Sequence, residues 1–207
     1  MSDYIYLERR SNSPDATLLL LLHGYNSNEA DLFSFSSYIP NHYHVVSLQA
    51  PLSLGQGYAW FPIHFEENME RWTDVKEVTT AISHVNDFLS FYANKNSSDN
   101  SDVVLLGFSQ GAMLSYAVGL QSVVVKGIAA LSGYLDPRFQ NSTNINTKSV
   151  YVSHGIYDEV IPYSWAQQSM SLLKEKGCTP AFHSYPQGHG INQENLMSLI
   201  QWLVEQQ

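Results

Sequence analysis

Val103-Val104-Leu105-Leu106-Gly107-Phe108-Ser109-Gln110-Gly111 is the stretch that decides the fold of this chain. Its opening run is apolar at every position, which predicts a strand buried on both faces, and the pattern of residues 112–118 predicts a helix. A serine between such a strand and helix is held in a strained backbone conformation, and glycines on both sides leave room for the sharp turn. The serine hydroxyl is then exposed above the carboxyl end of a sheet, where a nucleophile has to be.

Similar apolar runs recur along the chain, separated by helical patterns. The runs cover Tyr4–Leu7, Thr17–Leu22, His44–Leu48, Val103–Phe108, Ile128–Leu131, Val150–Ser153 and Ala181–Tyr185. The helical patterns cover Asp74–Ala93, Gln110–Leu120, Tyr163–Lys176 and Gln193–Glu205. Several runs are apolar at every position, which predicts strands that are buried on both faces of the sheet. The alternation predicts an α/β fold with a mostly parallel central sheet and helices on both faces, formed by residues 1–207 as one domain.

The composition is that of a globular domain and argues against two classes of partner. Of the 207 residues 44% are hydrophobic, which suffices for one sizeable core. Lys and Arg total 10 against 19 Asp and Glu, a formal charge of −9, and no basic residues gather into a patch or stripe. Nucleic acid and anionic membrane surfaces are therefore not expected as partners.

The cysteine content and the first residues indicate a compartment. Cys178 is the single cysteine, so no intrachain disulfide forms, and its place at a predicted helix end suggests a small packing residue. Residues 1–4 include no cationic segment, and the apolar run 18–22 is too short to span a bilayer. We expect a cytoplasmic protein without integral membrane association.

A constellation of three side chains predicts the chemistry. A serine hydroxyl becomes a strong nucleophile when a base takes its proton, and that base must be oriented by a third group. On this type of sheet the partners follow in the order Ser, then Asp or Glu, then His. Asp158 follows the predicted strand at 150–153, and His189 follows the one at 181–185. Because parallel strands present their carboxyl ends at one edge, we predict that Ser109, Asp158 and His189 converge as catalytic residues.

Asp136 is the alternative acid, because its loop also follows a predicted strand, at 128–131. We prefer Asp158, since a helix and the last predicted strand follow it and deliver the histidine. Asp102 lies at the opposite end of its strand and is not a candidate.

Backbone N–H groups near Ser109 are the expected stabilisers of a developing oxyanion. The helix after Ser109 aims its free N–H groups at that position. His23-Gly24-Tyr25 ends an early strand, and such a turn supplies a second N–H. We predict an oxyanion hole made by the amides of Tyr25 and Gln110. The histidine that opens this turn, like His154, is expected to brace the backbone.

The segment from Leu52 to Trp72 has no clear periodicity but is rich in aromatic residues. Loops at the edge of such sheets line sites, so Trp60, Phe61 and His64 are candidate substrate contacts in the wall of an apolar pocket. The alternative interpretation is that this segment covers the end of the core.

Spacing patterns typical of metal and nucleotide sites are missing from the sequence. The His, Cys and Asp residues lack the close repeats of zinc or calcium ligands. There is neither a P-loop lysine pattern nor G-x-G-x-x-G after the first strand. Acyl transfer to water needs no cofactor, so neither a cofactor nor a metal is expected.

Six blocks, in order and over nearly the whole chain, resemble the phospholipase/carboxylesterase group of α/β-hydrolases, small esterases without a lid that include acyl-protein thioesterases. The blocks are 21–24 (LLHG), 59–61 (AWF), 107–111 (GFSQG), 131–135 (LSGYL), 154–162 (HGIYDEVIP) and 185–189 (YPQGH). The resemblance implies a single-domain α/β-hydrolase fold with no large cap domain. It also implies Ser109 as nucleophile, Asp158 as orienting acid, His189 as base, and the N–H groups of Tyr25 and Gln110 at the oxyanion.

Four positions, in three places along the chain, depart from the pattern of this group. Tyr25-Asn26 replaces the usual Leu-Gly, Pro62 replaces the usual Asp, and Gly190 stands where many members carry Glu. Asparagine tolerates positive φ, so the turn can persist. These departures remove no catalytic group but argue against assigning a specific substrate by analogy.

The sequence therefore predicts a serine hydrolase that cleaves carboxylic esters, thioesters or lysophospholipids, with a small-molecule or lipid-like ester as its partner. Two alternatives stay open: a non-catalytic binding protein on the same scaffold, and a peptidase or other acyl hydrolase with the same triad. The resemblance also raises a homodimer as an expectation.

Overall fold

A computed structural model of the chain describes residues 4–13, 16–65, 71–96, 102–140 and 145–206. Its strands are β1 (Tyr6–Arg9), β2 (Thr17–Leu22), β3 (Tyr43–Leu48), β4 (Leu52–Ser53), β5 (Tyr58–Ala59), β6 (His64–Phe65), β7 (Arg71–Trp72), β8 (Val103–Phe108), β9 (Val125–Leu131), β10 (Ser149–Gly155) and β11 (Ala181–Tyr185). Its helices are α1 (Ala30–Phe33), α2 (Val75–Asn96), α3 (Gln110–Gln121), α4 (Tyr163–Glu175) and α5 (Gln193–Val204), with 3-10 turns η1 (Pro137–Phe139) and η2 (Ile145–Thr147).

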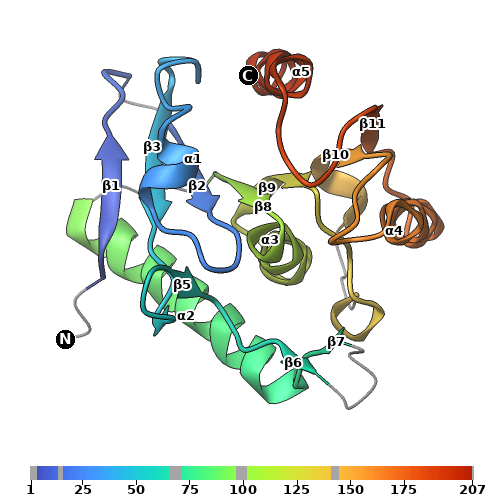
Figure 1. Ribbon diagram of the computed structural model, residues 1–207. Helices are drawn as coiled ribbons and strands as arrows, with labels where there is room; N and C mark the ends of the chain where they lie inside the picture. The colour runs from blue at the N-terminus through green and yellow to red at the C-terminus, as the bar shows by residue number, and fades with distance from the viewer. Residues whose placement is uncertain (1–3, 14–15, 66–70, 97–101, 141–144, 207) are drawn as a thin grey trace.

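Within the described residues, seven strands form one sheet in the order β1-β3-β2-β8-β9-β10-β11 (Figure 1). All neighbouring strands from β3 to β11 are parallel, and β1 is antiparallel to β3 at the edge. The predicted mostly parallel sheet is confirmed. The parallel strands bring the segments that follow β2, β8, β9, β10 and β11 to one edge, where open α/β sheets place their sites.

Apolar side chains form a separate cluster on each face of the sheet, so helices cover both faces as predicted. Residues of α2, α3 and α4 contribute to one cluster, and residues of α1 and α5 contribute to the other. Strand β2 shows why its sequence is apolar at every position: Leu18, Leu20 and Leu22 point into the first cluster, and Leu19 and Leu21 point into the second.

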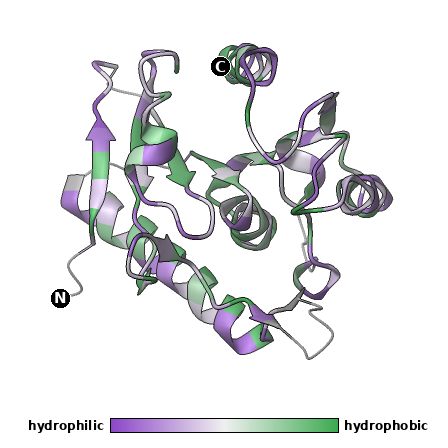
Figure 2. Cartoon of the chain, in the orientation of Figure 1, coloured by the Kyte–Doolittle hydropathy of each residue, from purple (hydrophilic) through white to green (hydrophobic). Residues whose placement is uncertain are grey.

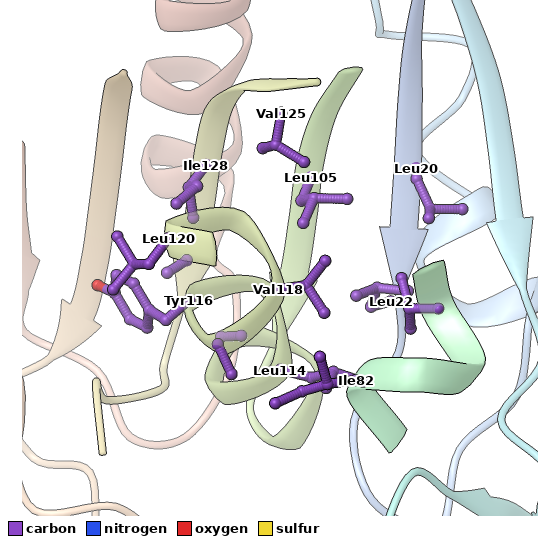
Figure 3. Close-up of a cluster of buried hydrophobic side chains, with 14 of the residues drawn as sticks. Leu20, Leu22, Ile82, Leu105, Leu114, Tyr116, Val118, Leu120, Val125 and Ile128 are labelled. Carbon is purple, nitrogen blue, oxygen red and sulfur yellow. The ribbon is translucent and has the colours of Figure 1, made fainter. Parts of the chain in front are cut away.

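Helix α3 is nearly enclosed by the rest of the protein. Every residue from Gln110 to Leu120 except Met113 is buried, and Figure 2 shows this helix largely hydrophobic, whereas α2 carries hydrophilic residues as well. Leu114 and Val118 pack between the sheet and Ile82 of α2 (Figure 3). A helix that is apolar around its circumference belongs in a core. The turn that precedes α3 is therefore anchored on one of the most enclosed elements of the fold.

The structure extends strand β10 beyond its predicted end at residue 153. His154 and Gly155 continue the strand because both still pair with β11, opposite Ser184 and Tyr185. A histidine and a glycine interrupt the apolar pattern by which a strand is predicted, but their backbone groups can still pair with the neighbouring strand. The extension has a functional consequence, since it brings the segments after β10 and β11 side by side.

The aromatic segment contains two short antiparallel ladders that its sequence does not indicate. Strand β4 pairs with β5, and β6 pairs with β7. Strands of two residues are too short to show an alternating pattern. Residues 66–70 of the segment lie outside the described part of the chain.

Candidate active site

Ser109 occupies the turn between β8 and α3 in the strained conformation that the motif predicts. Its φ is 54° and its ψ is −117°. A Cβ atom on Gly107 would lie 2.2 Å from the carbonyl oxygen of Gly111, and one on Gly111 would lie 1.9 Å from the carbonyl oxygen of Leu22. Only glycine fits either position. The two glycines let α3 approach β8 and β2 closely while the serine stands at the edge of the sheet.

His189 lies between Ser109 and Asp158. Its Nε2 is 2.9 Å from Ser109 Oγ, and its Nδ1 is 2.7 Å from Asp158 Oδ2. A carboxylate accepts hydrogen bonds but does not donate them, so Nδ1 carries the proton of the neutral ring and Nε2 faces the serine as an acceptor. The ring of Phe108 packs against the imidazole with centroids 5.0 Å apart. The structure thus brings together the three side chains that the sequence proposes from three separate loops.

The Asp158 side chain is fully buried, and its two oxygens have separate partners. Oδ1 accepts the backbone N–H groups of Val160 at 2.9 Å and Ile161 at 2.8 Å. Oδ2 faces His189. A buried carboxylate is tolerated when its oxygens accept hydrogen bonds, and these contacts also fix the orientation of the carboxylate plane.

His154 supports the same loop from the interior of the protein. Its Nε2 lies 2.9 Å from the carbonyl oxygen of Ile161 and 3.3 Å from Asp158 Oδ2. Both neighbours are acceptors, so Nε2 carries the proton. Burial lowers the pKa of His154, against the opposing effects of the Ile161 hydrogen bond and the Asp158 charge. The neutral ring therefore braces the loop, which is the role the sequence predicts for it.

Backbone contacts hold the His189 loop against the Asp158 loop. The N–H of Tyr157 donates to the carbonyl of Gln187 at 3.0 Å. A Cβ on Gly155 would lie 2.3 Å from the carbonyl oxygen of Gly188, so the two loops approach as closely as glycine permits. The side chain of Gln187 donates to the carbonyl of Gly190 at 2.8 Å. The pairing of β10 with β11 thus continues into the loops and sets the spacing of acid and base.

Asp136, the alternative acid, is held by an arginine. Nε of Arg138 donates to both carboxylate oxygens at 3.0 Å, and Nη2 donates to Oδ2. The same guanidinium donates to Thr73, from Nη1 to its carbonyl and from Nη2 to its hydroxyl, at 2.8 Å each. The hydrogen bonds and charge of Asp136 raise the pKa of Arg138. The geometry agrees with the preference for Asp158.

Backbone N–H groups are available beside Ser109. Gln110 is the first residue of α3, so its N–H has no partner within the helix. The turn that contains Tyr25 lies against the nucleophile, because a Cβ on Gly24 would be 3.4 Å from Ser109 Cβ. Asn26 has a φ of 58° and thus adopts the left-handed conformation that its residue type tolerates. The amides of Tyr25 and Gln110 stay the predicted oxyanion donors.

The side chain of Gln110 has a task that the sequence does not indicate. Its Oε1 accepts the backbone N–H of Trp60 at 2.9 Å, and its Nε2 donates to the carbonyl of Phe61 at 2.7 Å. The indole N–H of Trp60 donates to the carbonyl of His23 at 2.8 Å. Gln110 therefore ties the aromatic segment to the start of α3, next to the nucleophile.

His23 is a structural residue at the end of β2. Its Nε2 accepts the N–H of Ala50 at 3.0 Å, so the proton sits on Nδ1, which lies 2.7 Å from the carbonyl of Gly24. Burial lowers the pKa of this ring. Both nitrogens are engaged by the backbone, which fits the predicted bracing role.

A cavity of about 560 Å³ opens at Ser109 and His189, a size typical of small-molecule sites. Its apolar wall consists of Tyr25, Phe61, Ile63, Met113, Val160, Ile161 and Trp165. Its other lining residues are Ser109, Gln110, Thr73, Tyr134, Arg138 and His189.

Of the three predicted substrate contacts, only Phe61 lines this cavity. Trp60 is 2% exposed and turns its indole toward His23. His64 bonds to Glu77 of α2, with 2.7 Å between Nε2 and Oε2. The prediction is therefore corrected for Trp60 and His64, which fix the aromatic segment in place. Residue type alone does not reveal which way a side chain of an irregular segment points.

A protein-family model described as Phospholipase/Carboxylesterase matches residues 9–206, nearly the whole chain. The chain belongs to the phospholipase/carboxylesterase family. The family indicated by the sequence motifs is confirmed, and with it the α/β-hydrolase fold and the enzyme class, a hydrolase of the carboxylesterase or thioesterase type.

Relatives of this phospholipase/carboxylesterase family member include named esterases. Acyl-protein thioesterase 1 of Debaryomyces hansenii is 26% identical over 164 residues, which are 74% of this chain and 70% of that protein. The crystal structure of esterase PE8 is 27% identical with a TM-score of 0.86, and the match covers 98% of both chains. The Bacillus cereus carboxylesterase has a TM-score of 0.88 at 20% identity, covering 99% of this chain and 95% of that one. At 20% identity the likeness shows the fold alone.

Most of the pocket wall of this phospholipase/carboxylesterase family member has no clear signal in the sequence. Some signals were present, since Met113 lies one helical turn after Ser109 and Ile161 follows the predicted acid closely. Thr73 and Arg138 gave none, because they are 65 residues apart and no local pattern links them. Their meeting depends on how the loop after β9 folds over the start of α2.

Two further findings concern the described part of this family member. None of its helices is both long and apolar enough to cross a membrane, and it holds no group of three His, Cys, Asp or Glu side chains placed to bind a metal ion. Cys178 is buried, and burial raises the pKa of its thiol, as expected of a packing residue.

Proposed function

We propose that residues 1–207 act as one serine esterase domain that cleaves carboxylic esters or thioesters through a covalent intermediate on Ser109. The observation that carries the proposal is the position of His189, with Nε2 2.9 Å from the Ser109 hydroxyl and Nδ1 2.7 Å from the Asp158 carboxylate. Membership in the phospholipase/carboxylesterase family supports the same chemistry.

In the first half-reaction Ser109 Oγ forms a bond to the carbonyl carbon of the substrate while its proton moves to His189 Nε2. The N–H groups of Tyr25 and Gln110 donate to the resulting oxyanion. The intermediate collapses when the bond to the leaving oxygen or sulfur breaks, and His189 returns the proton to that atom. Asp158 stays ionised throughout and stabilises the imidazolium that forms in between.

In the second half-reaction water replaces the alcohol or thiol. His189 takes a proton from water as the water oxygen attacks the acyl carbon, and the same oxyanion donors act again. The bond between the acyl carbon and Ser109 Oγ then breaks, and His189 returns the proton to the serine. The products are a carboxylic acid and the regenerated enzyme.

The substitution Ser109→Ala tests the proposal. We expect the turnover of p-nitrophenyl butyrate to fall by about 10⁴- to 10⁶-fold, because only binding and oxyanion stabilisation remain. Circular dichroism and the melting temperature of the variant serve as controls for folding. Hydrolysis by Ser109→Ala at a near wild-type rate would overturn the assignment.

Two measurements separate the proposal from the alternatives. A fluorophosphonate probe should label the wild-type chain and not Ser109→Ala, whereas a binding protein with an inactive site would not react in either form. Matched ester and anilide substrates distinguish an esterase from a peptidase, because an amide needs stronger protonation of its leaving group. We expect the ester to be preferred.

A further inference from the structure

The pocket beside Ser109 combines an apolar wall with a permanent positive charge. Among the described residues that line the cavity, Arg138 is the one whose side chain stays charged at every physiological pH. The chain as a whole carries a formal charge of −9, so an exposed cation inside a pocket opposes the general field of the protein. Such a placement calls for a functional explanation.

The guanidinium of Arg138 is held rigidly in this position. Nε and Nη2 donate to Asp136, and Nη1 and Nη2 donate to Thr73. These bonds engage four of the five N–H groups that a guanidinium carries, leaving one on Nη1. A side chain fixed by its neighbours loses little conformational entropy when it binds a ligand group.

Exposure differs sharply between the two partners of this ion pair. The Arg138 side chain is 45% exposed, whereas the Asp136 side chain is 11% exposed. Arg138 lines the cavity and Asp136 is not among its lining residues, so the cation is the partner that a ligand in the cavity meets. Asp136 offsets part of the positive charge of Arg138, but the remaining N–H on Nη1 can still donate to a ligand. Hydrogen bonds that involve an ionised group are about twice as strong as neutral ones.

We propose that Arg138 forms an anion subsite in the substrate pocket and selects esters whose acyl group ends in a carboxylate. The inference rests on the proposed function, because the same cavity holds Arg138 and the nucleophile Ser109. The acyl group occupies the pocket in both half-reactions, since its bond to Ser109 forms in the first and breaks in the second, so a contact with its far end acts in each. Apolar residues of the same cavity wall, such as Met113 and Trp165, accommodate a hydrocarbon spacer.

The test compares pairs of p-nitrophenyl esters made from the same diacid. One ester of each pair has a free carboxylate at its far end, and the other has that carboxylate capped as a methyl ester. Glutaric, adipic and suberic acid give three spacer lengths. The measured quantity is the ratio of kcat/KM for the charged ester to that for the capped ester, which removes effects common to both substrates. We expect the wild-type ratio to exceed one at the best spacer length.

Two substitutions on the same ion pair should move this ratio in opposite directions. Arg138→Met removes the cation and should lower the ratio by about tenfold, the usual effect of one hydrogen bond to a charged group. Asp136→Asn removes the charge that the guanidinium contacts directly, keeps the two Thr73 contacts that hold Arg138, and should raise the ratio several-fold. Added salt should lower the ratio in the wild type and in Asp136→Asn but not in Arg138→Met.

The reciprocal design distinguishes a binding role from a purely structural one. Both substitutions remove the ion pair between Arg138 and Asp136, so a structural role would change hydrolysis of both esters alike and leave the ratio constant. That result, or a wild-type ratio below one at every spacer length, would overturn the subsite. If the wild-type chain hydrolyses neither ester, the proposed function itself fails. If the wild-type chain hydrolyses the capped ester but neither substitution changes the ratio, the proposed function stands and only the anion subsite is refuted.

Discussion

The loops that follow strands β9 and β10 each carry a buried aspartate at the same edge of the sheet, and only one of the two faces a histidine. Both aspartates make the same local hydrogen bond. Asp136 accepts the backbone N–H of Arg138, and Asp158 accepts that of Val160, in each case two residues onward. Neither burial nor local turn geometry therefore distinguishes the two acids.

The second carboxylate oxygen decides the difference. In Asp158 it is left for His189, because Oδ1 alone satisfies the backbone of its own loop. In Asp136 both oxygens are taken by the guanidinium of Arg138. A carboxylate at the right edge of the sheet thus becomes an orienting acid when its own loop leaves one oxygen unused.

The largest effect expected from this comparison comes from removing each negative charge in turn. Asp158→Asn should lower kcat for a neutral p-nitrophenyl ester by about 10⁴-fold, because the amide can stabilise neither the imidazolium nor the correct tautomer. Asp136→Asn should lower it by less than about tenfold, as a change in the pocket wall. Steady-state kinetics on the two purified variants measure both effects. Equal losses would remove the distinction between the acids.

The spacing between the Asp158 and His189 loops gives the second prediction. Gly155→Ala places a methyl group 2.3 Å from the carbonyl oxygen of Gly188 and must push the two loops apart. A displacement of this kind costs about 10²-fold in turnover. Gly188→Ala is the matched control, because its new Cβ would meet no atom closer than 3.7 Å. We expect the control to retain nearly full activity, and similar losses in both variants would contradict the argument.

The Asp136 loop should respond more in stability than in catalysis. Asp136→Asn weakens the contacts that join η1 to Thr73 through Arg138. We expect the free energy of unfolding to fall by about 1 to 3 kcal/mol, the cost of disturbing a partly buried charged hydrogen bond. Urea denaturation with unchanged m-values would measure it. An unchanged midpoint would mean that this ion pair contributes nothing to folding.

The smallest expected effect concerns the pH dependence of stability. The Asp158 loop is supported by a histidine, His154, which titrates near neutral pH, whereas the Asp136 loop is supported by Arg138, which stays charged. Burial lowers the pKa of His154, so the unfolded chain takes up a proton at this site before the folded chain does. The contribution of His154 to stability is therefore present above pH ~6.5, the ordinary histidine value, and is lost as the pH falls below it. His154→Gln keeps a donor for the carbonyl of Ile161 and removes the titration.

We expect His154→Gln to weaken the decrease in unfolding free energy between pH 7.5 and 5.5 by an amount on the order of 1 kcal/mol. His154→Leu should weaken it equally but also lose stability at pH 7.5, since it cannot donate to Ile161. Thermal unfolding at a series of pH values provides the comparison. A pH dependence identical to that of the wild type in both variants would show that His154 does not titrate on unfolding.

The sequence predicted what depends on local pattern and chain order. The sheet, the helices on both faces and the positions of Ser109, Asp158 and His189 follow from apolar runs and from loops after strands, which are local features. The pocket wall could not be predicted in the same way, because Arg138 meets Thr73 only in the folded chain. The aromatic residues misled for a related reason. Trp60 turns inward toward His23, and composition carries no information about that direction.

The tie from Gln110 to the aromatic segment uses only main-chain atoms of that segment, the N–H of Trp60 and the carbonyl of Phe61. A main-chain anchor does not depend on which side chains flank it. Ile63 lines the cavity and is only partly buried, so its exchange can change which acyl groups are accepted without shifting the amide that faces the reacting carbonyl, whereas Phe61 is fully buried in the core. Adaptation to new substrates, in nature or by directed evolution, has a simple starting point at Ile63.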